Sequence, residues 1–178
     1  DALVRLENGR TAEMILDTAA LDTASDFAKK SGSVLLAEIT QLAAAAANIK
    51  TAVRCAAIGR DAQFTLSALC RCELLDSEAL VSAALAGADA LPAFIGASAL
   101  GESAGALKSG LAAFEKWCDE AVARLVSAAK YTPLGPDPVI AFYIHRDAEI
   151  KNARIILNGK SNGLPVETIR KRVREVYG

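Results

Sequence analysis

The residues of this sequence that could do chemistry are concentrated in its C-terminal third. An otherwise apolar stretch carries a charged group, which consists of Arg146, Asp147, Glu149, Lys151 and Arg154. Asp147 and Lys151 are four residues apart, the spacing at which opposite charges on one helix pair with each other. We therefore expect a hydrogen-bonded structural network rather than a catalytic acid or base. Such a network can fix the register between packed helices.

The charged group leads to a specific expectation about stability. If Glu149 is buried in the network, Arg154→Ala should leave this carboxylate or a carbonyl at the helix end without a partner. The loss of such a partner costs about 1 to 3 kcal/mol. The sequence thus predicts a clear fall in melting temperature for this substitution.

The run Asn158-Gly159-Lys160-Ser161 ends like a phosphate-binding loop, in which backbone amides surround the phosphates of a nucleotide. The full motif requires another glycine five residues before Gly159, on a loop between a strand and a helix. Arg154 occupies that position, within a helical pattern. An enzyme that uses Lys160 on a nucleotide is therefore an unfavoured alternative.

Nucleophilic and metal chemistry are poorly supported. His145 is the only histidine, and no serine or cysteine is placed beside it by spacing alone. The pair Cys70 and Cys72 lacks the two-residue spacer of a zinc or redox pair. Together with Cys55 and Cys118 they are expected to be buried or free thiols in a reducing compartment. We predict no catalytic residue, no cofactor and no metal.

Composition narrows the class of partner. The chain has 178 residues, a net charge of −1 and a pI near 5.9, so its overall charge does not favour nucleic acid or an anionic membrane. A membrane span would need roughly 20 nearly uninterrupted apolar residues, and the sequence has none. The helix expected over 166–177 carries Arg170, Lys171, Arg172 and Arg174. These cations form either a solvated face or a contact with an acidic protein surface.

The elements that must position these residues are all expected to be helices. Apolar residues recur at helical spacing and glycines interrupt them, which gives helices over 2–8, 11–30, 34–58, 62–72, 78–86 and 111–130. Ser33, Asp61 and Asp76 suit helix N-termini. In the C-terminal third, Pro138 suits a first turn and Gly159 a C-terminal cap. Pro165 should start the last helix, and the fold class is all-α.

The chain is expected to consist of two helical units with a connection between them. Residues 87–110 contain several glycines among alanine and serine, and we predict short helical turns with hinges there. The units are then 1–86 and 111–178. An internal echo supports two copies of one unit, because each copy has an Ile-Lys pair followed by an arginine and, five residues after that arginine, a glycine. The arginines are Arg54 and Arg154.

The motifs of the C-terminal third resemble the signature of the C subunit of the rotary V/A-type ATP synthases, the counterpart of the d subunit of the eukaryotic V-ATPase. The matching runs, in the order of the family, are Pro138-Val139-Ile140-Ala141, Glu149-Ile150-Lys151-Asn152-Ala153-Arg154-Ile155-Ile156-Leu157, Gly159-Lys160 and Asn162-Gly163-Leu164-Pro165, with Glu167 and Ile169. A weaker collinear match covers Asn48-Ile49-Lys50 with Arg54 and Gly59, and Phe114-Glu115 with Asp119.

The resemblance implies a funnel of related helical domains with pseudo-threefold symmetry. It also implies a non-catalytic role on the cytoplasmic face of the membrane, between the central shaft and the membrane rotor ring. The matching positions are expected to be structural: Asn48, Lys50, Arg54, Gly59, Glu149, Lys151, Asn152, Arg154, Gly159, Lys160 and Pro165. Proton and sodium coupling both stay open.

The chain departs from the family pattern in two respects. The family commonly has an acidic residue about one turn before the Asn-Ile-Lys group, where this chain has Ala44, so the first unit is expected to have an incomplete charge network. The family's members are also longer, and this chain is expected to lack their N-terminal part. A helical scaffold that serves partners outside the ATPase is the alternative function.

Overall fold

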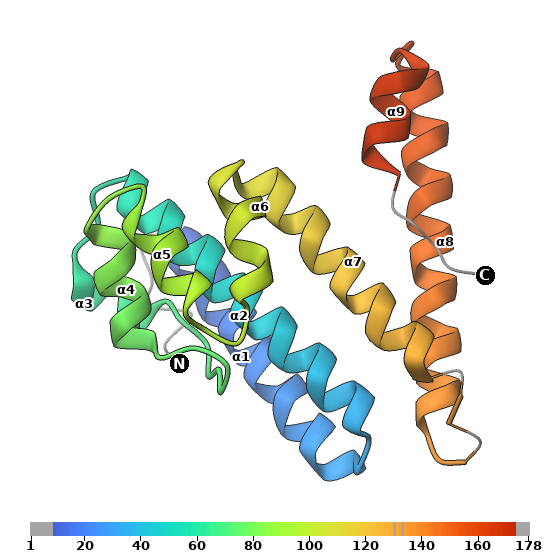
Figure 1. Ribbon diagram of the computed structural model, residues 1–178, viewed down its shortest axis with the longest axis horizontal. Helices are drawn as coiled ribbons and strands as arrows, with labels where there is room; N and C mark the ends of the chain where they lie inside the picture. The colour runs from blue at the N-terminus through green and yellow to red at the C-terminus, as the bar shows by residue number, and fades with distance from the viewer. Residues whose placement is uncertain (1–8, 130, 133, 174–178) are drawn as a thin grey trace.

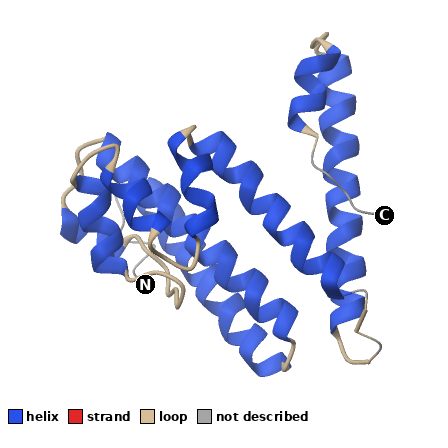
Figure 2. Ribbon diagram, viewed as in Figure 1, coloured by secondary structure: helices blue, strands red, loops and turns tan. Residues whose placement is uncertain are grey.

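The computed structural model describes residues 9–129, 131–132 and 134–173. Within these residues every regular element is a helix, and Figure 2 shows only helices and the loops between them. The all-α prediction is confirmed. The helix expected over 2–8 lies outside the described residues, as do the basic Arg174 and the end of the chain.

The first two helices form an antiparallel pair. α1 (Gly9–Ser31) ends at Gly32, which has φ +70°, a conformation that glycine adopts without strain. α2 (Val34–Ala57) begins at the predicted cap, where the Ser33 hydroxyl accepts a hydrogen bond from the amide of Leu36 at 3.0 Å. It ends with Ile58 as C-cap, followed by Gly59 at φ +70°, so a glycine interrupts the helix as predicted.

Short helices follow and pack over one end of α2. They are α3 (Ala62–Ser67), α4 (Ser77–Leu85), α5 (Ala90–Gly96), the 3₁₀ turn η2 (Gly101–Ser103) and α6 (Ala104–Lys108). Asp61 and Asp76 cap α3 and α4 as predicted. The prediction that the α3 helix reaches about residue 72 is wrong, because the backbone of Cys70 leaves the helix to bond with the Asn48 side chain.

α7 (Leu111–Ala129) packs along α2 and completes the main core. Its apolar residues face this core, since Phe114 and Ala121 are core residues and Leu111, Cys118 and Leu125 pack against them. The core takes buried residues from α2, α4, α5, α6 and α7 and the loops between them: Leu42, Ala45, Ile49, Ala52, Leu75, Leu80, Leu91, Ile95, Leu100, Leu107, Phe114 and Ala121. We call residues 9–129 the body.

Two further helices extend from the body in Figure 1, and we call residues 137–173 the arm. α8 (Asp137–Ser161) contacts α7 and α2, and α9 (Val166–Arg172) packs back on α8. A small cluster of Leu35, Val126, Ala129 and Ala141 joins arm to body. At 25 residues α8 is one residue longer than α2. Pro138 lies in its first turn and Pro165 is the N-cap of α9, both as predicted.

Candidate functional site

The matched residues of α2 include a buried polar joint to the loop after α3. Asn48 is 2% exposed, and its side chain bonds both backbone groups of Cys70: Nδ2 donates to the carbonyl oxygen at 2.8 Å, and Oδ1 accepts from the amide at 2.9 Å. An amide side chain satisfies both groups because it has a donor and an acceptor. Asn48 therefore holds the turn after α3 against the middle of α2.

The cations that follow Asn48 on α2 are nearer the surface. The Lys50 ammonium lies 3.3 Å from a carboxylate oxygen of Glu115, which joins α2 to α7. Arg54 is exposed. Both cations line a groove of about 600 Å³ beside α1, together with the acidic Glu13 and Asp17. Because charges of both signs line this groove, it does not form a concentrated positive site for phosphates.

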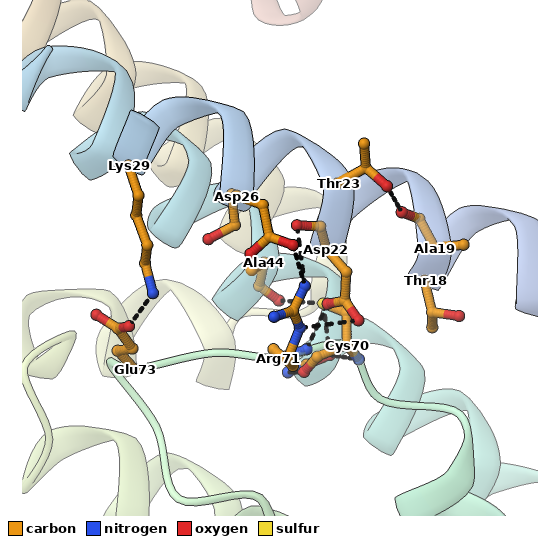
Figure 3. Close-up of polar contacts among 12 residues, drawn as sticks. Thr18, Ala19, Asp22, Thr23, Asp26, Lys29, Ala44, Cys70, Arg71 and Glu73 are labelled. Atoms are coloured by element: carbon orange, nitrogen blue, oxygen red, sulfur yellow. Dashed lines mark hydrogen bonds and ion pairs between the residues drawn. The ribbon is translucent and has the colours of Figure 1, made fainter. Parts of the chain in front are cut away.

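A second set of polar contacts ties α1 to the loop between α3 and α4 (Figure 3). The Arg71 guanidinium bonds the Asp26 carboxylate at 2.8 Å and approaches that of Asp22 at 3.2 Å. The hydrogen bond from Arg71 holds the pKa of Asp26 below its usual range. Nearby, Lys29 pairs with Glu73.

Sequence reasoning missed this set of contacts. Asp22 and Asp26 are four residues apart, so they lie on one face of α1, and that spacing is the signal in the sequence for a cation from another element.

The charged group of α8 lies on the surface of the arm. Lys151 pairs with Asp147 at 2.6 Å, as its spacing predicted, and Arg146 pairs with Glu149 at 2.7 Å. The buried network expected from the sequence is wrong, because the Glu149 side chain is 49% exposed and Arg154 is exposed. The apolar residues around these charges do not bury them, since the described residues cover α8 on one side. Asn152, on the covered side, is the buried polar residue of this segment.

Gly159 has a different role from the predicted cap. α8 continues past it to Ser161, and Asn162 is the C-cap. Gly159 is buried against α9, where an added Cβ would lie 2.7 Å and 2.9 Å from the Cγ1 and Cδ1 atoms of Ile169. Its missing side chain thus permits close packing of α8 and α9.

The remaining candidates for chemistry do not form a reactive centre. Lys160 is exposed at the end of a helix rather than on a phosphate-binding loop. Burial raises the pKa of the Cys70 and Cys118 thiols to about 11, so both stay protonated at neutral pH. All four cysteines are free thiols, as predicted. The His145 Nε2 atom is buried and lacks a hydrogen-bond partner among the described residues.

Neither a metal site nor a membrane-crossing helix is present in the part of the chain that the structure describes. In it, no group of three or more histidine, cysteine, aspartate or glutamate side chains is placed to hold a metal ion. Among the same residues, no helix combines the length and the apolar character that a membrane crossing requires.

The fold and the site define an all-α protein whose matched residues lie at joints between helices and on the arm surface. Comparison with protein families gives a more specific result. Residues 2–172 match the family model described as ATP synthase (C/AC39) subunit. The chain therefore belongs to this family, and the resemblance stated from its sequence is confirmed.

A curated relative agrees with this assignment. The C subunit of the V-type sodium ATPase of Enterococcus hirae is 31% identical over 67 residues, which are 38% of this chain and 20% of that protein. The match thus spans about a fifth of the relative's length. No solved structure matches the chain.

Proposed function

We propose that this chain belongs to a non-catalytic central-stalk subunit of a rotary V/A-type ATPase or ATP synthase. In this role it couples the central shaft to the membrane rotor ring during ATP-linked transport of protons or sodium ions. The observation that carries the proposal is the family match over residues 2–172. The relative from the sodium ATPase supports it independently, although over a shorter segment.

The construction of the body suits a part that transmits force. A coupler must keep its shape under load, and α2, about 36 Å long, is held along its length by α1, α4 and α7. The joint between Asn48 and Cys70 and the pair of Lys50 and Glu115 resist sliding between these elements. We propose that the matched residues of α2 serve the rigidity of the body rather than a reaction.

The proposed partners are the central-shaft subunits and the membrane rotor-ring subunits, with the protein peripheral on the cytoplasmic face. The division into helical units at 1–86 and 111–178, with 87–110 between them, is part of the same proposal. In it, residues 87–110 transmit load between the units, because α5 packs on α4, α6 packs on α7, and α5 and α6 pack on each other.

Copurification tests this function. The full-length protein that contains this chain carries an affinity tag, and membranes from cells that assemble the complex are stripped of the catalytic head. We expect the tagged protein to stay with the ring. We also expect the amount of purified shaft protein that binds to these membranes to rise with the amount of tagged protein on them. Membranes from cells without the tagged protein are the control. Recovery only in the soluble fraction, or mainly with proteins outside the ATPase, would favour the scaffold alternative.

Calorimetry tests the remaining enzymatic alternative. We expect titration of ATP and magnesium to give no binding heat for either the unaltered chain or Lys160→Ala. Binding that Lys160→Ala abolishes would overturn the non-catalytic assignment, because it would mean that Gly159, Lys160 and Ser161 hold a nucleotide.

A further inference from the structure

The outer side of α8 carries a regular apolar stripe that no described part of the chain covers. Its residues recur at alternating intervals of four and three, and we call them the outer seam: Val139, Tyr143, Arg146, Ile150, Ala153 and Leu157. Five of the six are apolar, and Arg146 is the charged member. Val139, Tyr143, Ile150 and Leu157 are 70%, 72%, 51% and 65% exposed. The 4-3 interval is the one that keeps side chains on the line where two helices meet.

The opposite side of α8 explains why this seam is not the packing face of the arm. Ala141, Asn152 and Gly159 are buried; Ala141 packs in the cluster that joins arm to body, and Gly159 packs against Ile169 of α9. At 100° per residue these positions point about 140 to 160° away from Val139 and Leu157. α8 therefore has two apolar sides, and the described part of the chain covers one of them.

Charge differs sharply along the seam. From Ile150 to Val166 the sequence contains no acidic residue. Arg154 and Lys160 are exposed, and the helical period places them about 60° to either side of Leu157. Residues 1–150 carry 13 basic and 19 acidic residues, so the basic character of this part of α8 is local. Its apolar line has a cation on each flank.

We propose that the outer seam docks an amphipathic helix of a partner protein that has apolar residues at 4-3 spacing and acidic residues on both flanks. Apolar knobs would cover Ile150, Ala153 and Leu157, while the acids would meet Arg154 and Lys160. The seam runs about 27 Å from Val139 to Leu157, which is enough for five turns of such a helix. The inference does not rest on the proposed role in a rotary ATPase, because it concerns the chemistry of one surface.

Two other occupants fit the surface less well. An anionic membrane would attract Arg154 and Lys160, but a continuous lipid surface would also meet the carboxylates of Asp147 and Glu149 beside the seam, whereas a partner helix can place its acids opposite Arg154 and Lys160 alone. A second copy of the chain, docked through the same seam, would place its own Arg154 and Lys160 against a surface that is already basic. Its acids on α8 near the seam, Asp147 and Glu149, are already paired with Lys151 and Arg146.

The test uses synthetic peptides of about 21 residues and fluorescence anisotropy. One peptide has leucine at the 4-3 positions and glutamate on both flanks, and the other has the same composition in an order without the 4-3 spacing. We expect the first to bind the chain at least about tenfold more tightly. Leu157→Ser and the double variant Arg154→Glu with Lys160→Glu should each weaken it about tenfold, which corresponds to about 1.4 kcal/mol.

Matched variants on the body control for non-specific effects. Ile58→Ser removes an apolar side chain that is 66% exposed, and Lys108→Glu reverses an exposed cation. Both should leave the affinity unchanged, and circular dichroism should show that every variant is folded. Binding of the acidic peptide should also weaken as salt rises from about 0.05 to 0.3 M, because exposed charge pairs are screened.

Three results would overturn the proposal. Equal affinity for the two peptides, or no effect of Leu157→Ser and the charge reversal, would mean that the seam does not select an acidic helix. Binding to phosphatidylserine vesicles that Leu157→Ser abolishes, without binding of the acidic peptide, would identify a lipid surface as the occupant. Light scattering that shows a dimer, lost in Leu157→Ser, would identify a second copy as the occupant. The copurification test of the proposed function is independent of these three results, so a failure of one proposal can be told from a failure of the other.

Discussion

The body and the arm bury their side chains to very different extents. In the body, Ile49, Leu80, Ile95 and Phe114 are fully buried in one core that several helices share. In the arm, the buried apolar side chains of the described residues are Ala141, against the body, and Ile169, against Gly159. The body is thus held by its own interior, whereas the described residues leave an apolar side of α8 exposed.

This difference teaches where the free energy of folding is concentrated. Burial of apolar surface is the main favourable term, and large side chains without solvent exposure contribute most to it. Substitutions in the body should therefore lower the free energy of unfolding, whereas matched substitutions on the outer side of α8 should change binding more than folding. The largest loss of stability is expected at the centre of the body, and the smallest on the outer side of α8.

Phe114→Ala should destabilise the protein most. Phe114 is 0% exposed in α7, and truncation of a buried phenylalanine costs about 3 to 5 kcal/mol through lost transfer free energy and the cavity left behind. Tyr143→Ala, at a 72% exposed position on α8, should change the free energy of unfolding by less than about 0.5 kcal/mol. Urea denaturation measures both. Similar effects from the two substitutions would contradict the contrast between body and arm.

Asn48→Ala should have the next largest effect, about 2 to 4 kcal/mol. The substitution leaves the amide and the carbonyl of Cys70 without the partners that they have at 2.9 Å and 2.8 Å, in a site with little access to water. Asn48→Asp keeps the acceptor but loses the donor and places a carboxylate in that site. Thermal unfolding of both variants measures the joint, and an unchanged melting temperature for Asn48→Ala would show that the joint is dispensable.

Much of the fold follows from local signals in the sequence. Ser33, Asp61, Asp76 and Pro165 each start a helix because a capping side chain or a fixed φ acts within a few residues. The end of α3 could not be predicted in this way, because it depends on Asn48, which is distant in the sequence. Local signals therefore predict the first residue of a helix well. They predict its last residue less well where a tertiary contact ends the helix.

The candidate site shows the same limit. The family could be recognised from short runs of residues. The exposure of Glu149 and Arg154 could not be predicted, because periodicity identifies an apolar side of a helix but does not show whether another element covers it. Gly159 illustrates a second ambiguity. A glycine near the end of a helical pattern can be a cap or a site of close approach, and only the position of Ile169 decides between them.

Gly59 in the body and Gly159 in the arm, the two glycines of the internal echo, also differ in their surroundings. Gly159→Ala should weaken the docking of α9 by about 1 to 3 kcal/mol, because the new Cβ would overlap Ile169. Hydrogen exchange should then quicken in α9 and not in α2. Gly59→Ala should cost about 1 kcal/mol at the end of α2, since it places a side chain at φ +70° in open space.

A second substitution separates overlap with Ile169, the cause at Gly159, from backbone strain at positive φ, the cause at Gly59. Ile169→Val removes the Cδ1 atom, so it should partly restore the docking of α9 in the Gly159→Ala variant and have no such effect on Gly59→Ala. A double-mutant cycle between Gly159 and Ile169 measures this coupling. Absence of coupling would mean that α9 is not held through this contact.

Arg154→Ala should have the smallest effect on stability, within about 0.5 kcal/mol, because Arg154 is exposed and lies on the uncovered side of α8. This value replaces the loss of about 1 to 3 kcal/mol that a buried network would have given. Thermal unfolding of the isolated chain measures it, with Arg60→Ala as an exposed cation of the body for comparison. A loss above about 1 kcal/mol specific to Arg154→Ala would mean that the arm buries this side chain in solution. The contrast between a self-contained body and a half-covered arm would then no longer hold.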